Sequence, residues 1–146
     1  MKKYWYKFRV KYDKTMDTGK RKKVSEEYLV DAESFTETEK RATKAATDLI
    51  GTKDFDITAI SREPITEILR EEENEDSFWY KAVVVLFSED EETGIEKSSP
   101  QTIYVNAPTT EEADRMVREH MSDCVSDWKI KSISETKVLD VLEYNK

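Results

Sequence analysis

Apolar and charged residues alternate over residues 4–12, and this period of two predicts a half-buried strand. One face is aromatic or aliphatic and is expected to lie in the core: Tyr4, Tyr6, Phe8, Val10 and Tyr12. The other face carries one aromatic residue and three cations: Trp5, Lys7, Arg9 and Lys11. A second apolar run, residues 79–87, begins with the same Trp-Tyr-Lys triplet as residues 5–7.

This triplet is the first of five matches between the two halves of the chain. The offset between matching residues stays between 73 and 75. The later pairs are Asp17-Thr18-Gly19 with Glu92-Thr93-Gly94, Val30-Asp31-Ala32 with Val105-Asn106-Ala107, Ser34/Glu37 with Thr109/Glu112, and Phe55-Asp56-Ile57 with Trp128-Lys129-Ile130. A near-constant offset predicts a tandem duplication. We expect one repeat at residues 1–70, an acidic linker at 71–77 and a second repeat at 78–146.

Each repeat is expected to begin with a two-stranded hairpin. Its turn holds Gly19 in the first repeat and Gly94 in the second, since glycine adopts a positive φ without steric cost. The returning strand is predicted over residues 24–32 and over residues 102–107.

A helix follows each hairpin, over about residues 35–50 and 110–125. Both helices are preceded by a capping box, in which side chains satisfy free amides of the first turn: Ser34 with Glu37, and Thr109 with Glu112. Thr36 with Glu39 offers an alternative start for the first helix, and Gly51 suits its C-terminal cap.

The last element of each repeat starts as a strand, at residues 55–61 and 128–134. The alternation slips near residues 62–64 and 135–137, which predicts either a bulged strand or two short strands. The whole pattern predicts an α+β protein, in which antiparallel sheets are each covered on one face by a helix.

Charge is distributed unevenly along the chain. The net charge is −8, yet residues 1–24 hold ten Lys or Arg against Asp13 and Asp17, a balance of +8, so the remainder carries −16. This basic segment is either a solvated hairpin or an anion-binding surface. Cations beside an exposed aromatic ring can hold single-stranded nucleic acid. The candidate nucleic-acid-binding residues are Trp5, Lys7, Arg9, Lys11, Lys20, Arg21, Lys22 and Lys23.

The first strand of the second repeat is apolar on both faces. Such a strand is normally covered on both sides. Either the other repeat packs on the second face, or a partner protein or second copy of the chain does so. The candidate protein interface on that face consists of Trp79, Val83, Val85 and Phe87.

Few residues suit catalysis or metal binding. His120, the only histidine, precedes Cys124, the only cysteine, by four residues, a spacing that would suit a nucleophile–base pair or a soft metal. The corresponding residues of the first repeat, Ala45 and Leu49, are packing residues, so we expect helix-face roles for the pair. Three glycines leave no phosphate-binding loop. We therefore expect no catalytic residue, no metal and no cofactor, and a protein that is not an enzyme.

The single cysteine permits no disulfide within the chain, and a reducing compartment is the natural expectation. No run approaches the roughly 20 apolar residues that span a membrane. The first residues lack the apolar core of a signal peptide. A cytoplasmic protein without a membrane partner is expected.

Residues 5–10 and 28–37 resemble a family of small uncharacterised proteins, a domain of unknown function from Bacteroides-type gut bacteria and their phages. The likeness is best over residues 4–70, and the second repeat is a divergent partner. The resemblance implies an origin in a phage or mobile element and action in a bacterial host cell. It supplies no activity and no functional residues.

Two functional hypotheses follow. The first is a non-enzymatic protein-interaction module, an accessory or counter-defence factor of a phage or mobile element, which binds a partner protein or forms a homo-oligomer. The alternative is nucleic-acid binding through the basic first hairpin. The acidic whole-chain charge favours the first hypothesis, because it repels a polyanion.

Overall fold

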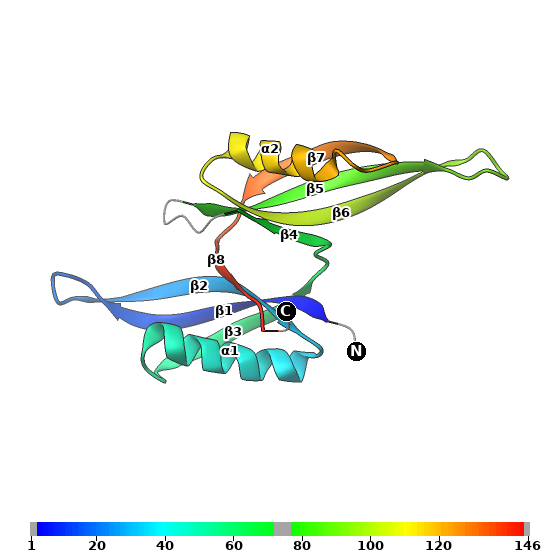
Figure 1. Ribbon diagram of the computed structural model, residues 1–146. Coiled ribbons are helices and arrows are strands. Elements are labelled where there is room, and N and C mark those ends of the chain that lie inside the picture. The colour runs from blue at the N-terminus through cyan, green and yellow to red at the C-terminus, as the bar shows by residue number, and fades with distance from the viewer. Residues whose placement is uncertain (1–2, 72–76, 145–146) are drawn as a thin grey trace. The chain divides into compact units, whose positions relative to one another are not determined.

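The computed structural model describes residues 3–71 and 77–144. The chain divides into two compact units, Met1–Pro64 with Lys137–Lys146 and Ile65–Thr136 (Figure 1). Each unit holds a four-stranded sheet and one helix that packs on it, which confirms the α+β class. Of the predicted acidic linker, residues 72–76 lie outside the described residues.

The first unit contains strands β1 (Tyr4–Thr15), β2 (Arg21–Ala32) and β3 (Phe55–Glu63), helix α1 (Phe35–Ile50) and strand β8 (Val138–Leu142). The strand order is β3-β1-β2-β8. Strand β1 pairs antiparallel with β2 and with β3, whereas β8 joins β2 in parallel.

The second unit repeats this plan with strands β5 (Phe78–Glu89), β6 (Glu96–Ala107) and β7 (Asp127–Glu135), helix α2 (Thr110–Met121) and strand β4 (Glu67–Arg70). The strand order is β4-β6-β5-β7. Strand β5 pairs antiparallel with β6 and β7, and β4 joins β6 in parallel.

The predicted repeats exchange their last strands. Strand β4 follows β3 in sequence but completes the sheet of the second unit, and β8 follows β7 but completes the sheet of the first. The slip in alternation therefore marks a break between two strands, since β4 follows β3 and β8 follows β7, and Pro64 lies where the chain passes from one unit to the other. Because of this exchange, the boundaries of the compact units differ from those of the predicted repeats, 1–70 and 78–146.

The core of each unit is built from the predicted strand faces and one helix face. In the first unit Phe8 and Val10 are fully buried beneath the small helix residues Ala42, Ala45 and Ala46. In the second, Ala82 and Val84 pack with Ala113, Met116 and Val117. Small side chains on α1 allow a helix to approach a sheet closely.

The helix caps follow the sequence in detail. The Ser34 hydroxyl accepts a hydrogen bond from the Glu37 amide at 3.1 Å, and the Glu37 carboxylate accepts one from the Glu33 amide at 3.2 Å. Helix α1 therefore begins after Ser34, and the alternative start at Thr36 is wrong. At the other end Gly51 has φ 80° and donates to the Thr47 carbonyl at 3.0 Å.

Helix α2 begins as predicted, because the Thr109 hydroxyl accepts from the Glu112 amide at 3.1 Å. It ends at Met121 rather than near residue 125, and Ser122 lacks the left-handed conformation that Gly51 supplies to α1. The strands of the first hairpin are longer than predicted. Strand β1 ends at Thr15 rather than Tyr12, and β2 begins at Arg21 rather than Val24.

Candidate functional site

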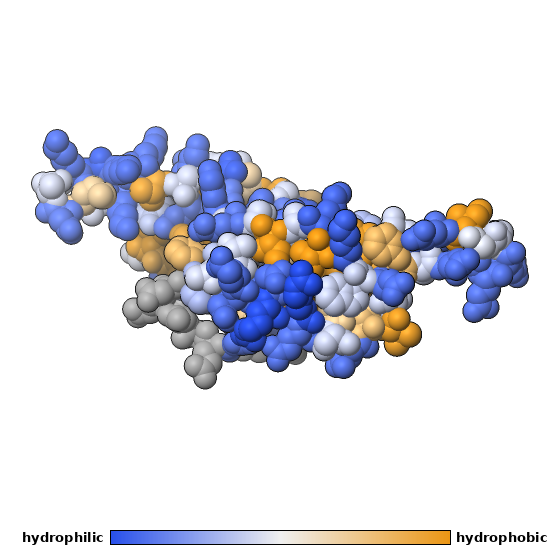
Figure 2. All heavy atoms as spheres, turned by 90° about the horizontal axis from the view of Figure 1, so that it is seen from above, coloured by the Kyte–Doolittle hydropathy of each residue, from blue (hydrophilic) through white to orange (hydrophobic). Residues whose placement is uncertain are grey.

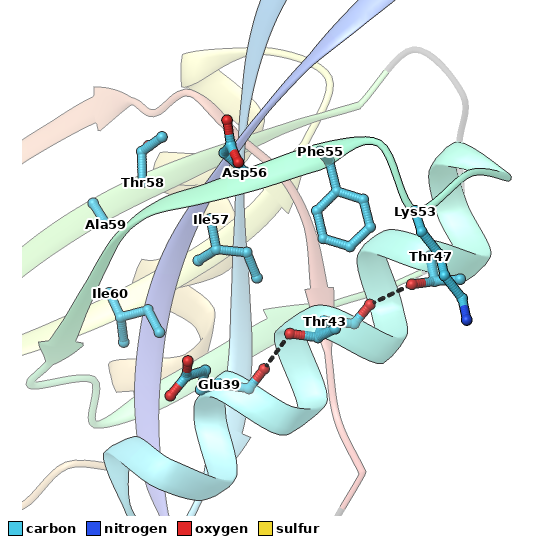
Figure 3. Close-up of a pocket in the computed structure, with 10 residues that line it drawn as sticks. All are labelled: Glu39, Thr43, Thr47, Lys53, Phe55, Asp56, Ile57, Thr58, Ala59 and Ile60. Atoms are coloured by element: carbon cyan, nitrogen blue, oxygen red, sulfur yellow. Dashed lines mark hydrogen bonds between the residues drawn. The ribbon is translucent and has the colours of Figure 1, made fainter.

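An open groove lies between helix α1 and strand β3 in the first unit (Figure 3). Strand β3 is an edge of its sheet, and its side chains Phe55, Ile57 and Ile60 point toward the helix. These three residues pack against the core but remain partly exposed. The groove therefore offers apolar surface beside a strand edge.

The helix side of the groove is a stripe of residues spaced four apart, Glu39, Thr43 and Thr47. The Thr43 hydroxyl donates to the Glu39 carbonyl at 2.8 Å, and the Thr47 hydroxyl donates to the Thr43 carbonyl at 2.8 Å. Because both hydroxyls fold back onto the helix, their short side chains leave the groove open and present methyl groups and hydroxyl oxygens to it.

Opposite charges stand at the two ends of the groove. Glu39 lies at the end next to Ile60, and Lys53 lies at the end next to Phe55 (Figure 3). Beyond Lys53 lies a polar hollow against the first hairpin, lined by residues of both charges: Lys11, Tyr12, Asp13 and Lys23 of the hairpin, with Asp54 and Asp56 opposite. Partial burial, and secondarily the neighbouring Glu26 carboxylate, raises the pKa of Tyr12.

The middle of the β3 edge carries no exposed charge. Thr58, Ala59 and Ser61 are exposed and uncharged, whereas exposed Asp56 and Arg62 lie nearer the two ends of the strand. Native proteins usually guard a sheet edge with charged residues, lysine above all, because a bare edge can pair with another strand. The edge strand β7 of the second unit carries two exposed lysines, Lys129 and Lys131, at the positions that Asp56 and Thr58 hold in β3.

The corresponding helix stripe also differs in the second unit. At an offset of 75, Glu39 and Thr43 correspond to Asp114 and Arg118. Arg118 donates to the Asp114 carboxylate at 2.9 Å, so a long paired side chain stands where the first unit has a threonine. A comparison of the two repeats could have indicated this site from the sequence, because the stripe has the same spacing in both helices but different side chains.

The candidate nucleic-acid-binding residues fall into two groups. Two of the cations on β1 are paired with acids of neighbouring strands, Lys7 with Glu63 at 3.4 Å and Arg9 with Glu27 at 2.9 Å. Trp5 is half-buried, and the Lys3 ammonium lies 5.1 Å from its ring centroid. The structure does not bring this group together as an open cationic platform.

The second group lies on the outer part of the β1–β2 hairpin, which extends past helix α1 (Figure 1). Its cations are all exposed: Lys11, Lys20, Arg21, Lys22 and Lys23. Within residues 3–71 and 77–144, no carboxylate forms an ion pair with any of these five side chains.

The candidate protein interface of the second repeat is unevenly exposed. Trp79 is 3% exposed, and the Arg70 guanidinium lies 5.0 Å from its ring centroid. Val83, Val85 and Phe87 are half-buried. Their role in binding a partner stays a prediction.

His120 and Cys124 do not form a pair on one helix. His120 is exposed, and Cys124 lies beyond the end of α2, where it packs partly buried against the core. Among the described residues no group of three His, Cys, Asp or Glu side chains is arranged to hold a metal ion. No helix in the described part of the chain is long and apolar enough to cross a membrane.

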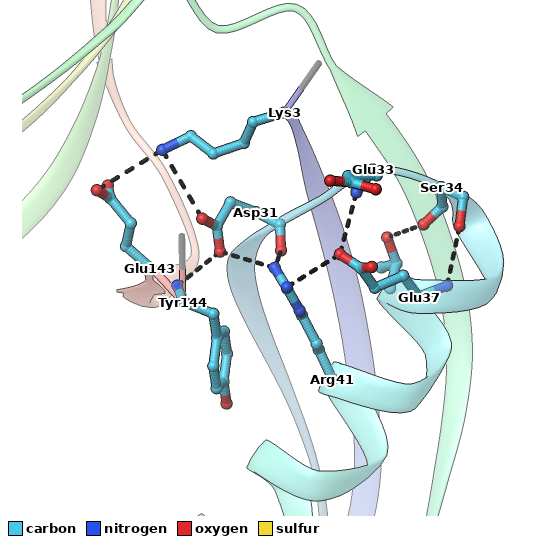
Figure 4. Close-up of polar contacts among 9 residues, drawn as sticks. Lys3, Asp31, Glu33, Ser34, Glu37, Arg41, Glu143 and Tyr144 are labelled. Atoms are coloured by element: carbon cyan, nitrogen blue, oxygen red, sulfur yellow. Dashed lines mark hydrogen bonds and ion pairs between the residues drawn. The ribbon is translucent and has the colours of Figure 1, made fainter. Parts of the chain in front are cut away.

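A polar cluster that sequence reasoning missed surrounds Asp31, whose side chain is fully buried at the end of β2 (Figure 4). Its carboxylate accepts a hydrogen bond from the Tyr144 amide at 2.7 Å and lies 3.4 Å from Arg41 and 3.7 Å from Lys3. Arg41 also donates to the Asp31 carbonyl and pairs with Glu37 at 3.0 Å. These contacts join α1, β2 and the residues after β8, so the cluster holds the exchanged strand.

These features define an α+β protein of two strand-exchanged units, in which the first unit has an open groove beside its edge strand. The chain belongs to the DUF4494 family, since residues 4–144 match the family described as "Domain of unknown function (DUF4494)". The match spans both repeats and confirms the expected membership of an uncharacterised family. Neither the curated proteins nor the solved structures contain a match.

Proposed function

We propose that this protein is a non-enzymatic protein-interaction module whose binding site is the groove between α1 and β3. The occupant is an extended segment of a partner protein that adds to β3 as a further strand. Strand addition of this kind takes its affinity from main-chain hydrogen bonds and its specificity from pockets for alternate side chains. The main observation behind the proposal is the uncharged middle of the edge strand β3 beside apolar Phe55, Ile57 and Ile60.

The groove sets the chemistry of the segment. Alternate side chains would enter between the strand and the helix, where partly exposed rings and aliphatic groups favour apolar residues. The end next to Glu39 favours a basic residue, whereas the other end carries both Lys53 and Asp56 and selects no single charge. The expected partner sequence is therefore an alternating apolar strand with a basic residue at the end next to Glu39.

Divergence between the units supports a role for the groove. The fold tolerates Arg118 with Asp114 on the helix and lysines on the edge strand, as the second unit has them. Packing of the unit therefore does not require the threonine stripe on α1 or the uncharged middle of β3 that the first unit has. An accessory or counter-defence role in a phage or mobile element rests on the resemblance alone and is part of this proposal.

Selection of extended peptides from a random library on the intact chain tests the proposal. We expect enriched peptides with alternating apolar residues, and we expect their binding to shift the NMR signals of β3 amides above all others. Peptides that enrich equally well on an unrelated acidic protein, or that shift amides away from β3 and α1, would contradict the proposal.

A matched pair of substitutions localises the binding. Thr43→Arg places the arginine of the second unit inside the groove and should weaken the selected peptides more than tenfold. Thr36→Arg makes the same change at an exposed position of α1 outside the groove and should leave the affinity unchanged. Equal effects of both substitutions would overturn the assignment of the groove.

A further inference from the structure

The two units carry projecting hairpins of opposite charge. We name residues 11–25 the basic arm and the corresponding residues 86–100 the acidic arm. The basic arm holds six Lys or Arg against two Asp, a net charge of +4, whereas the acidic arm holds five Asp or Glu against one Lys, a net charge of −4. Because both arms occupy the same place in the duplicated unit, the fold does not dictate either charge.

The basic arm is a two-stranded ribbon with solvent on both faces. Its strands pair in register from Tyr12 with Val24 to Thr15 with Arg21, and the Met16 amide donates to the Lys20 carbonyl at 2.8 Å across the turn. Every residue of the arm is exposed except Tyr12 and Val24, which are half-buried at its base. Figure 2 shows mainly hydrophilic residues over this arm, at the left edge of the view.

Cations project from both faces of the ribbon. Side chains alternate between faces along each strand, so Arg21 and Lys23 point to one side and Lys22 to the other, directly opposite Lys14 on the neighbouring strand. Like charges on facing strands repel each other and cost stability. The Lys14–Lys22 pair therefore destabilises the free arm, and binding of a polyanion would relieve this repulsion.

The acidic remainder of the chain does not cancel this local field. Met16, at the turn, lies four residues beyond Tyr12 at the base, an extended length of roughly 14 Å. The Debye length at physiological ionic strength is about 8 Å. The outer cations therefore act on a ligand largely independently of acids in the body of the protein.

We propose that the basic arm binds double-stranded DNA by entering the major groove. A two-stranded β-ribbon fits the width of that groove in B-form DNA, whereas the major groove of duplex RNA is too narrow to admit it. Lys14 and the run Lys20–Lys23 contact the phosphates on the two groove walls, and this contact is independent of base sequence. This binding is separate from the peptide groove and does not rest on it.

The arm lacks the features that single-stranded binding needs. Single strands are held by stacking of bases on aromatic side chains. Tyr12, half-buried at the base, is the only aromatic residue of the arm, and Trp5 lies outside it beside Lys3. We therefore infer a double-stranded ligand, in place of the single-stranded nucleic acid that the sequence pattern around Trp5 indicated.

Fluorescence anisotropy of a labelled DNA duplex of mixed sequence, titrated with the full chain at several salt concentrations, tests the proposal. If the five contacting cations each neutralise one phosphate, the plot of log K against log salt has a slope of roughly −4.5. Replacing Lys20, Arg21, Lys22 and Lys23 with Ser leaves only Lys14 of the five, so the slope falls to roughly −1 and the affinity at low salt falls more than tenfold.

The matched control removes four exposed lysines elsewhere, Lys40, Lys44, Lys129 and Lys137, and so has the same net charge as the arm variant. It should bind the duplex as the unaltered chain does. Equal losses in both variants would show that total charge matters and the arm does not. Absence of duplex binding at low salt, or tighter binding of the single strand, would overturn the proposal.

Sedimentation of the protein alone tests whether the basic arm binds an acidic protein surface instead of DNA. We expect the same sedimentation for the unaltered chain and the arm variant. Concentration-dependent self-association that the arm variant loses, together with no duplex binding, would assign the arm to the acidic arm of a second copy and overturn the DNA proposal.

Discussion

The backbone amide of Tyr144 donates a hydrogen bond of 2.7 Å to the buried carboxylate of Asp31, a residue 113 positions earlier in the chain (Figure 4). Asp31 is the penultimate residue of β2 in the first repeat, whereas Tyr144 follows β8 from the second. The bond therefore fastens an exchanged strand to the unit that receives it. In the second unit the corresponding residue is Asn106, whose amide donates to the Phe78 carbonyl at 3.4 Å.

Asp31→Asn should destabilise the protein by about 3 kcal/mol, because it removes one member of a buried charge cluster and leaves Arg41 and Lys3 without their central anion. The amide keeps the size of the side chain, so the loss reports charge rather than packing. Urea unfolding gives the free energy. Asp13→Asn, at an exposed position of the basic arm, serves as the control and should change stability by less than about 0.5 kcal/mol. Equal effects of the two substitutions would contradict the role of Asp31.

The strand exchange predicts that the two repeats assemble when made as separate chains. Fragment 1–71 lacks the β8 that its sheet receives, and fragment 77–146 lacks β4. Mixing the fragments should restore both sheets and give a one-to-one complex with the circular dichroism of the intact chain. Sedimentation and thermal unfolding of each fragment alone and of the mixture provide the measurement. Two fragments that each fold as monomers and ignore one another would refute the exchange.

Much of each unit could be predicted from local signals. The strand faces followed from alternation, and helix α1 was bounded correctly because Ser34 and Gly51 mark its ends chemically. The pairing of Arg9 with Glu27 also lay within reach, since a hairpin turn at Gly19 fixes the register between the strands. Applying that register would have removed Arg9 from the nucleic-acid candidates.

The exchange itself could not be predicted in this way. Strands β4 and β8 have four and five residues, too few for alternation to specify more than a face. Periodicity tells which side of a strand is buried, but it does not tell which neighbour the strand pairs with. Comparing the repeats indicates the helix side of the groove, but the groove itself depends on how α1 lies across β3 and not on either element alone.

The cap of α1 can be tested against its alternative. Ser34→Ala should cost about 1 kcal/mol, because the Glu37 amide loses its acceptor. Thr36→Ala should be neutral or slightly stabilising, since Thr36 is exposed inside the first turn and alanine is the better helix former. Thermal unfolding of both variants measures the difference. A larger loss from Thr36→Ala would place the start of the helix two residues later.

The stability of the first unit should decrease at alkaline pH because of Tyr28. Its ring stacks on Phe8 with 5.5 Å between centroids, and its hydroxyl donates to the Glu26 carboxylate at 3.3 Å. Burial, and secondarily the Glu26 charge, raises the pKa of Tyr28 well above its usual value of 10.0. Below pH 10 the hydroxyl is protonated in both states and its full contribution is present. Above pH 10 the unfolded chain releases the proton while the folded chain retains it, so stability falls as pH rises through the folded pKa.

Urea unfolding from neutral to strongly alkaline pH measures this dependence, and Tyr28→Phe isolates it. One retained proton changes the free energy of unfolding by about 1.4 kcal/mol per pH unit. The phenylalanine variant loses this slope but keeps a weaker one, because partial burial also raises the pKa values of Tyr12 and Tyr144. At neutral pH the variant should lose only the contribution of the hydroxyl–carboxylate bond. Identical alkaline slopes in the two proteins would mean that Tyr28 ionises in the folded state as readily as in the unfolded chain.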